Sequence, residues 1–176
     1  AIMQDREKNI WIGTYLNLNQ YFDEQFEIYG QSEGLYNSLV WSIMQDRKGS
    51  YWLGTEGGLI KFDQGKNKNQ NTFVNYTNSN KGLVTNTTAL FEDQEGYIWY
   101  SNFGNGVSRL NPITRQIQNF NVSNGLTSND VYCINGDAQG NVWIGTNKGG
   151  AMRYSLSNKQ FEYFSEKEGL GGDQVY

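Results

Sequence analysis

Four aspartates stand at one fixed distance from four tryptophans, and these carboxylates are the side chains of the sequence most suited to acid–base chemistry. Each aspartate lies six residues before its tryptophan. The pairs are Asp5–Trp11, Asp46–Trp52, Asp93–Trp99 and Asp137–Trp143. The four could form a ring of carboxylates, and the composition does not exclude a carboxylate-only, glycosidase-like site in this chain. Each aspartate also begins a turn, usually of the form Asp-x-x-Gly, so we expect the four carboxylates to cap turns.

The remaining composition excludes most other catalytic chemistry. The chain has no histidine, which removes Ser-His and Cys-His nucleophiles, the usual zinc sites and histidine as a general base. Its one cysteine, Cys133, excludes an internal disulfide and a cysteine-rich metal site. The string GTNKGG at 145–150 superficially resembles a phosphate-binding loop, but strands are expected on both sides of it, so we interpret it as a hairpin turn. We therefore expect no cofactor, no metal and no catalytic residue.

The net charge and the hydropathy of the sequence argue against nucleic acid and membrane as partners. The 176 residues include 14 basic and 18 acidic side chains, for a net charge of −4, and no basic cluster, so nucleic-acid binding is not expected. No apolar run approaches the roughly 20 residues of a membrane span, so no membrane contact by this segment is expected. No leader precedes Ala1, and localisation cannot be read from the termini.

Two independent markers repeat along the whole chain. The four tryptophans are 41, 47 and 44 residues apart, and Gly-Leu pairs at 34–35, 82–83, 125–126 and 169–170 are 48, 43 and 44 apart. These spacings indicate four repeats of about 44 residues. We place them at 1–33, 34–81, 82–124 and 125–168, and residues 169–176 begin the next repeat.

Each repeat is interpreted as four short strands. An inner strand such as 40–46 leads through the aspartate turn into the tryptophan strand, a glycine turn and a third strand follow, and an aromatic strand such as 160–164 ends the repeat. The position four before each aspartate holds a small residue, as expected where inner strands crowd together. The pattern predicts an all-β protein, a β-propeller built of four-stranded antiparallel blades, with about four blades in this chain.

The ends of the chain are in register with one another. Residues 169–176 followed by 1–5 read GLGGDQVYAIMQD, which matches GLTSNDVYCINGD at 125–137. Four blades alone would leave two open faces, each worth roughly 10 kcal/mol of exposed apolar surface. Three arrangements remain: the chain is part of a larger ring with further blades, two copies associate into an eight-bladed ring, or four blades close tightly. We favour the larger ring and rank self-association second.

The repeat resembles a known family. Residues 125–150 read GLTSNDVYCINGDAQGNVWIGTNKGG, and residues 34–63 follow the same pattern almost throughout. The string is similar to the two-component regulator propeller repeat, and the resemblance covers essentially the whole chain. The first repeat departs from the pattern, with TYLNLNQYF after its tryptophan and Lys8 where the other turns have glycine. The third has YSNFGNG in place of IGTxxGG.

The resemblance implies a function in signal transduction. Such repeats form the periplasmic sensor region of hybrid two-component system histidine kinases and related regulators, in which the kinase lies beyond a β-sandwich and a membrane span. It implies a non-catalytic sensor module whose ligand is an oligosaccharide, with any kinase activity outside this sequence. The alternatives are a propeller scaffold for protein–protein interaction or self-assembly without a small ligand, and a propeller enzyme such as a lyase or quinoprotein dehydrogenase.

One end of the blades is the expected binding face. In a propeller, the loop entering the innermost strand and the loop joining the second and third strands lie on the same side. These loops carry amide, carboxylate and aromatic groups suited to sugar hydroxyls and ring faces, although an ordinary polar loop surface would look the same. The candidate ligand-binding residues are Tyr15, Asn37, Trp41, Glu56, Asn86, Phe103, Asn105, Asn129, Asp130, Asn147, Lys148 and Asp173.

Overall fold

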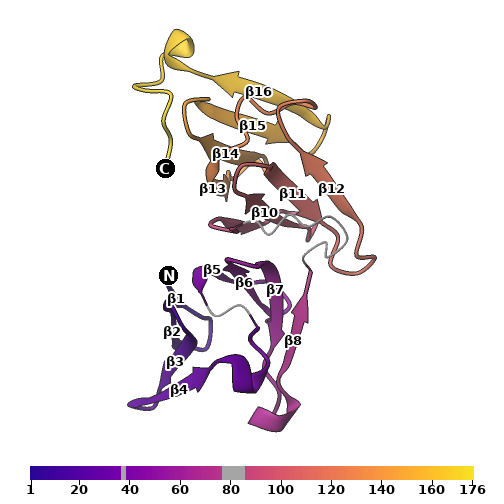
Figure 1. Cartoon of the computed structure of the whole chain (residues 1–176). Helices are drawn as coiled ribbons and strands as arrows, with labels where there is room; N and C mark the ends of the chain where they lie inside the picture. Colours follow the sequence, from indigo (N-terminus) through magenta and orange to yellow (C-terminus); the bar gives the residue numbers. More distant parts are fainter. Residues whose placement is uncertain (37–38, 77–85) are drawn as a thin grey trace. The chain divides into compact units, whose positions relative to one another are not determined.

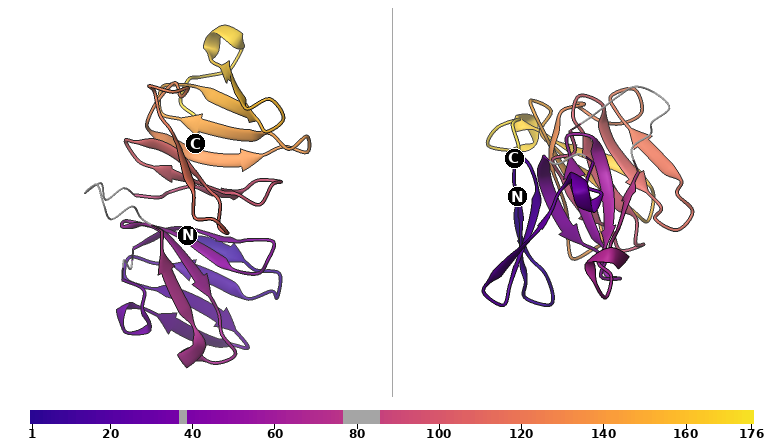
Figure 2. Two further views of the ribbon diagram at one scale, coloured as in Figure 1. Left: turned by 90° about the vertical axis from the view of Figure 1, so that its right-hand side faces the viewer. Right: turned by 60° about the horizontal axis from the view of Figure 1, so that its bottom comes forward.

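The computed structural model describes residues 1–36, 39–76 and 86–176 and divides the chain into two compact units. Unit 1 is Ala1–Thr87 and unit 2 is Thr88–Tyr176. Each unit contains two four-stranded antiparallel sheets, in which each strand pairs with the next one along the chain. The all-β propeller architecture predicted from the repeats is thereby confirmed, and each sheet is one blade (Figures 1 and 2).

Unit 1 contains the first two blades. The first blade consists of β1 (Ile2–Gln4), β2 (Ile10–Gly13), β3 (Leu18–Phe22) and β4 (Gln25–Tyr29). The second blade consists of β5 (Val40–Gln45), β6 (Tyr51–Thr55), β7 (Gly58–Asp63) and β8 (Thr72–Asn75). Two short 3-10 helices, η1 (Gln31–Glu33) and η2 (Lys68–Gln70), lie in the connections.

Unit 2 contains the other two blades. The third blade consists of β9 (Leu90–Glu92), β10 (Ile98–Asn102), β11 (Gly106–Leu110) and β12 (Ile117–Phe120). The fourth blade consists of β13 (Val131–Gly136), β14 (Val142–Thr146), β15 (Ala151–Ser155) and β16 (Gln160–Phe164), followed by the 3-10 helix η3 (Glu166–Glu168). No helix among the described residues could span a membrane.

The aspartate of each repeat ties its own turn to its own tryptophan. In the second blade, one oxygen of Asp46 accepts the backbone N–H groups of Lys48 and Ser50, each at 2.9 Å, and the other accepts the indole N–H of Trp52 at 2.8 Å. The indole bond recurs in the other blades, where Asp5, Asp93 and Asp137 accept from Trp11, Trp99 and Trp143. Turn capping is confirmed, and these bonds inside single blades explain the fixed spacing of six residues.

The carboxylate of Asp137 is expected to make the folded chain sensitive to acid. Hydrogen bonds from the Asn141 side chain, and then from Trp143, lower the pKa of Asp137 from 3.8 to about 2. Because the folded-state pKa is the lower one, this contribution to stability is complete above pH about 4 and is lost as the pH falls toward 2. Asp137→Asn should therefore reduce the change in the urea midpoint between these pH values. A midpoint whose pH dependence equals that of the wild type would contradict this expectation.

Small residues are required on the inner strands because the neighbouring strand of the same blade approaches closely there. Gly54 on β6 lies opposite Ser42 on β5, and Gly145 on β14 lies opposite Cys133 on β13. A Cβ atom at either glycine would collide with the side chain opposite. Burial raises the pKa of the Cys133 thiol, which keeps it protonated rather than nucleophilic. These contacts support the structural interpretation of Cys133.

Aromatic side chains fill the space between the two blades of each unit. In unit 1, the ring of Trp11 lies 4.5 Å from that of Tyr51 and 5.8 Å from that of Phe62. In unit 2, the ring of Trp99 lies 5.2 Å from that of Tyr154 and stacks on Phe120. Both indoles are fully buried. Trp11 and Trp99 therefore act as spacers between neighbouring blades, as the repeat pattern predicts.

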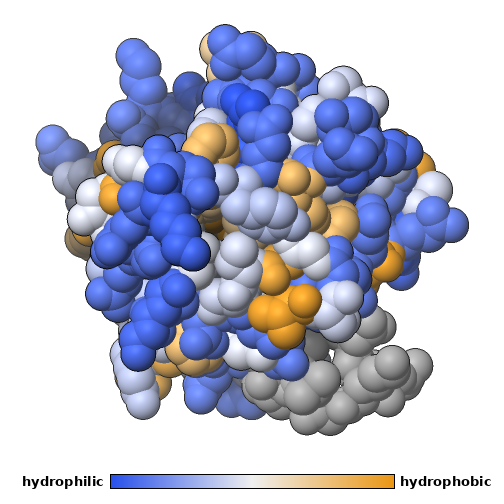
Figure 3. Space-filling view, turned by 90° about the horizontal axis from the view of Figure 1, so that it is seen from above, coloured by the Kyte–Doolittle hydropathy of each residue, from blue (hydrophilic) through white to orange (hydrophobic). Residues whose placement is uncertain are grey.

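The outer faces of the first and fourth blades differ in character. On the first blade, Ile2, Phe26 and Ile28 are 77%, 61% and 53% exposed. On the fourth blade, Trp143 is half-buried beneath Arg153 and stacks on Phe164. The surface seen in Figure 3 carries hydrophobic residues in small groups among hydrophilic ones. The first blade therefore carries an open apolar face, whereas the outer ring pair of the fourth is covered by an arginine.

Candidate functional site

Backbone hydrogen bonds join the two classes of loop that were expected to form a binding face. In unit 1, Val40 N–H donates to Thr14 O at 3.2 Å, which connects the start of an inner strand to the preceding blade. In unit 2, Asn147 N–H donates to Asp130 O at 2.9 Å, and Val175 N–H donates to Thr146 O at 3.0 Å. The Gly-Leu loops and the loops between second and third strands therefore share one edge of each unit. We call this edge the loop face.

The predicted residues of unit 1 lie on the loop face, mostly in contact with solvent. Tyr15 is 77% exposed and Trp41 is 44% exposed. Glu56 is exposed at the tip of its turn, and Asn86 is half-buried. Asn37 lies outside the described residues. Among the described residues, no hydrogen bond or ring contact joins one of these side chains to another. The predicted residues of unit 1 are therefore not assembled into a cluster.

Several predicted residues of unit 2 hold the loops in place. The Asn129 side chain accepts the Val122 backbone N–H at 3.0 Å, and the Asp173 carboxylate accepts the Glu166 N–H at 2.9 Å. The Asp130 carbonyl accepts from Asn147. We assign Asn129 and Asp173 a structural role because their side chains bind backbone groups of their own loops.

The remaining predicted residues of unit 2 are polar and accessible. Lys148 is exposed, with a backbone φ of 63°. Asn105 is exposed, and its amide lies 3.5 Å from the Phe103 carbonyl. The Asn147 side chain accepts a hydrogen bond from Gln174 at 3.0 Å. Asn147 and Gln174 therefore form an amide pair that joins two loops.

A stack of three aromatic rings forms the centre of the loop face of unit 2. The Tyr132 ring lies between Phe103, at 6.3 Å and 27°, and Tyr176, at 5.1 Å and 11°. Phe103 is 44% exposed and Tyr176 is 78% exposed. The rings come from the β10–β11 loop, from β13 and from the last residue of the chain, so the stack crosses from one blade to the next.

Tyr132 and Tyr176 were missed by the sequence analysis, although a signal for them was present. Both directly follow a valine at the same position of the repeat, and Trp41 follows Val40 at that position of the second repeat. Phe103 and Tyr15 likewise share one position, four residues after the tryptophan of their repeats. Aligning the repeats by these positions would have added Tyr132 and Tyr176 to the candidate residues of the loop face.

The loop face is suited to non-covalent recognition of a ligand. Adjacent ring faces and amide groups match a ligand with an apolar face and hydroxyl groups at its rim. In the described parts of the chain, no three histidine, cysteine or carboxylate side chains gather closely enough to hold a metal ion. The exposed rings and amide groups are thus available for stacking contacts and hydrogen bonds.

Two segments match one protein family. Residues 36–57 and 125–148 match the model described as two component regulator propeller. The chain contains two component regulator propeller repeats. The second of these segments includes Tyr132 and the Asn147 side chain of the loop face. The family pattern therefore coincides with elements that build this face.

Solved structures show the same architecture. The extracellular domain assigned to a hybrid two component system of B. thetaiotaomicron is 28% identical, with a TM-score of 0.80 over 97% of this chain and 23% of that one. An extracellular domain assigned to a one component system of the same organism is 20% identical, with a TM-score of 0.79 over 98% and 26%. The chain thus spans about a quarter of the length of these structures.

A propeller enzyme shares the fold as well. Virginiamycin B lyase from Staphylococcus aureus is 15% identical, with a TM-score of 0.71 over 93% of this chain and 54% of that one. At this identity the likeness shows the fold alone. No curated protein matches the chain. The two component regulator propeller repeats therefore remain the more specific similarity.

Proposed function

We propose that this chain is a non-catalytic, extracytoplasmic sensor module whose loop face binds an oligosaccharide and signals to a kinase or related output domain outside the chain. The observation that supports it most directly is the three-ring stack of Phe103, Tyr132 and Tyr176, because exposed aromatic faces are the groups on which sugar rings stack. The extracellular location of the similar domains supports a site outside the cytoplasm.

Polar groups beside the stack would set the orientation of the sugar. Gln174 lies two residues before Tyr176 and donates to Asn147, and the neighbouring Lys148 is exposed. Amide and ammonium groups donate hydrogen bonds to hydroxyl oxygens, and the amide oxygens accept from hydroxyl hydrogens. In this proposal the rings supply most of the affinity and the amides select the arrangement of hydroxyl groups.

Removing the central ring is expected to weaken binding about tenfold, the equivalent of about 1.4 kcal/mol. The test is a thermal-shift screen of an oligosaccharide panel, followed by calorimetric titration of any hit against the wild type and Tyr132→Ala. Tyr163→Ala is the matched control, since Tyr163 is a half-exposed tyrosine on β16 of the same unit, outside the stack. Equal losses in both variants, or no stabilisation by any saccharide, would contradict the proposal.

A scaffold without a small ligand is the second candidate, and the open apolar face of the first blade favours it. We propose that further blades of a longer chain cover this face, as the greater length of the similar structures suggests, and that self-association is the alternative. Sedimentation of the 176-residue chain tests the alternative. A monomer at all concentrations would exclude self-association, and an Ile28→Glu variant that stays associated would exclude the first blade as the interface.

A further inference from the structure

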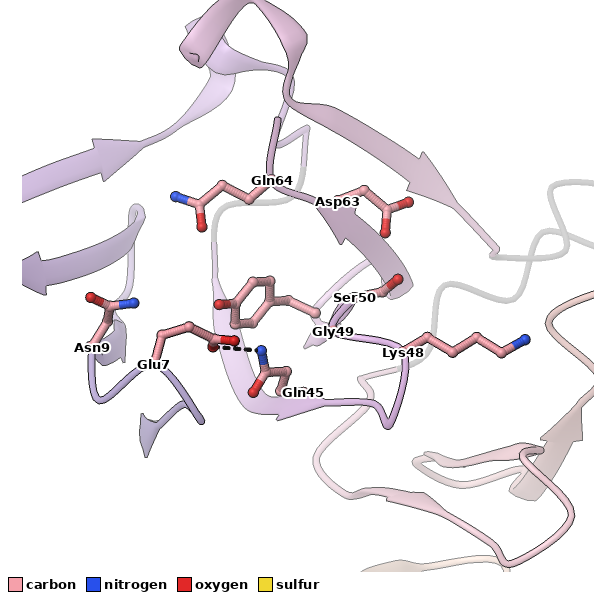
Figure 4. A pocket seen from close by; sticks show the side chains of 9 residues that line it. Glu7, Asn9, Gln45, Lys48, Gly49, Ser50, Asp63 and Gln64 are labelled. Atoms are coloured by element: carbon pink, nitrogen blue, oxygen red, sulfur yellow. Dashed lines mark hydrogen bonds between the residues drawn. The ribbon is translucent and has the colours of Figure 1, made fainter. Parts of the chain in front are cut away.

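A polar pocket lies between the two blades of unit 1, at the edge opposite the loop face. Its volume is about 360 Å³, and it opens beside the aspartate turns of both blades (Figure 4). It is lined by Glu7, Asn9, Gln45, Lys48, Gly49, Ser50, Tyr51, Asp63 and Gln64. The loop-face residues take no part in it, so the pocket is independent of the proposed sugar site.

Unit 2 fills the corresponding place with its own arginine. Arg109 on β11 lies opposite Trp99, and its Nε donates to Asp93 at 2.8 Å. Its Nη2 donates to Glu95 at 2.7 Å, and the guanidinium carbon lies 3.9 Å from the centre of the Tyr97 ring. Arg109 is 6% exposed. This interblade position therefore accommodates a guanidinium held by two carboxylates.

Unit 1 keeps the two carboxylates but replaces the arginine with an uncharged side chain. Counted from the aspartate, Asp5 and Glu7 correspond to Asp93 and Glu95. The residue opposite Trp11 on the neighbouring strand is Gln20, which corresponds to Arg109. At the far side of the pocket, Gln64 corresponds to Leu156, which packs against the apolar core of unit 2. The pocket of unit 1 is therefore the place that a long cation and a leucine fill in unit 2.

After the hydrogen bonds around the pocket are made, most of the polar groups still available in it are hydrogen-bond acceptors. The Tyr51 hydroxyl donates to Asp5 at 2.8 Å and takes the place of the arginine Nε. The amide groups of Asn9 and Gln64 use their N–H groups on Asp5 and on Gln20. Their carbonyl oxygens have no donor among the described residues. The pocket therefore combines amide oxygens with the carboxylate of Glu7.

Glu7 is the charged group that the pocket leaves available. Its carboxylate accepts one hydrogen bond, from Gln45 at 3.0 Å, where the equivalent Glu95 holds an arginine. The other carboxylate of the lining, Asp63, is paired with Lys61 at 2.7 Å. Figure 4 shows the Lys48 side chain extending away from Glu7. A donor-rich cation would thus meet a carboxylate and amide oxygens without displacing an ion pair of the chain.

We propose that this pocket binds a guanidinium group supplied by a ligand, in the position that Arg109 occupies in the other unit. A planar guanidinium carries five N–H donors, which suit the carboxylate of Glu7 and the amide oxygens of Asn9 and Gln64. The group can come from a free arginine derivative or from an arginine side chain of a peptide. This inference goes beyond the proposed sugar-binding function and does not depend on it.

The test is calorimetric titration at low ionic strength with Nα-acetyl-L-arginine amide. The matched ligand is the citrulline analogue, in which a neutral urea replaces the guanidinium at nearly the same shape. We expect saturable binding of the arginine compound and at least tenfold weaker binding of the citrulline compound. A capped Gly-Arg-Gly peptide identifies the source, because equal or tighter binding indicates a peptide side chain and weaker binding indicates a small molecule.

Two variants locate the binding in this pocket. Glu7→Gln should weaken binding of the arginine compound at least tenfold, whereas Glu95→Gln, which alters the equivalent carboxylate in unit 2, should leave it unchanged. Gln20→Arg should abolish binding by supplying the guanidinium from within the chain. The proposal is overturned by an absence of saturable binding, by equal binding of the citrulline compound, or by equal affinities of the Glu7→Gln variant and the wild type. Glu7 is exposed, so the Glu7→Gln result does not depend on a change of fold.

Discussion

Replacing Asp93 by alanine is expected to destabilise unit 2 by about 3 kcal/mol. The substitution removes the acceptor of the Trp99 indole N–H, the cap of the turn at Glu95 and Tyr97, and the partner of the buried Arg109. The largest part of the loss comes from the arginine, because a buried cation that loses a partner keeps its desolvation cost. Guanidinium chloride unfolding, followed by near-UV circular dichroism, measures the change.

A second substitution separates the stability contributed by the Asp93–Arg109 ion pair from that contributed by the capped turn. If the buried cation dominates the loss, Asp93→Ala should cost clearly less in an Arg109→Met background than in the wild type. Asp137→Ala is the control, since the same turn and indole bonds are present there in surroundings that are more open to water. Equal effects of Asp93→Ala in both backgrounds would show that the turn, not the ion pair, accounts for the loss.

The second large effect is expected at the tryptophans between blades. Trp99→Ala should lower the free energy of unfolding by about 3–5 kcal/mol, because the indole is fully buried against Phe120 and Tyr154 and its removal leaves a cavity. Trp143→Ala, at the same repeat position, should cost less than half as much, because Trp143 is half-buried and lies on the outer face of its blade. Chemical denaturation of both variants compares the two positions.

This comparison also tests the role of the tryptophans as spacers. Both substitutions remove the same indole–aspartate hydrogen bond, with distances of 2.8 and 2.9 Å, so the difference between them reports the packing of one blade on the next. Equal losses would mean that the tryptophan acts within its own blade. A larger loss at Trp143 would contradict the assignment of its side chain to the outer face of the fourth blade, away from the third.

The two units differ in the charged groups at the equivalent positions of Arg109 in unit 2 and Gln20 in unit 1. In unit 2 the position is closed by Arg109, whose pKa is raised against the effect of burial by Glu95 and Asp93. In unit 1, burial by itself raises the pKa of Asp5, but hydrogen bonds from Asn9, Trp11 and Tyr51 outweigh it and lower that pKa. Asp5 therefore stays charged without a cation beside it. Unit 1 has a polar pocket beside this position, and in unit 2 the position holds the buried Arg109.

The sequence alone determined the repeat, the strand count of each blade and the role of the aspartates. These features depend on interactions within about ten residues: a turn capped by Asp46, an indole six residues later and a hairpin closed by glycines. Local hydrogen bonds and alternation of side chains act at fixed sequence distances, so their pattern can be counted along the chain. The propeller architecture follows from four copies of that pattern.

Only the tertiary structure decided which residues meet between blades. Phe103 and Tyr132 are 29 residues apart in sequence, and Tyr132 and Tyr176 are 44 apart, yet each pair is in ring contact. The polar pocket likewise depends on one side chain between the blades. Gln20 is shorter than the arginine at the equivalent position of unit 2. Such contacts follow from how one sheet packs on the next, a geometry set by the summed packing of many side chains and not by hydrogen bonds within one repeat.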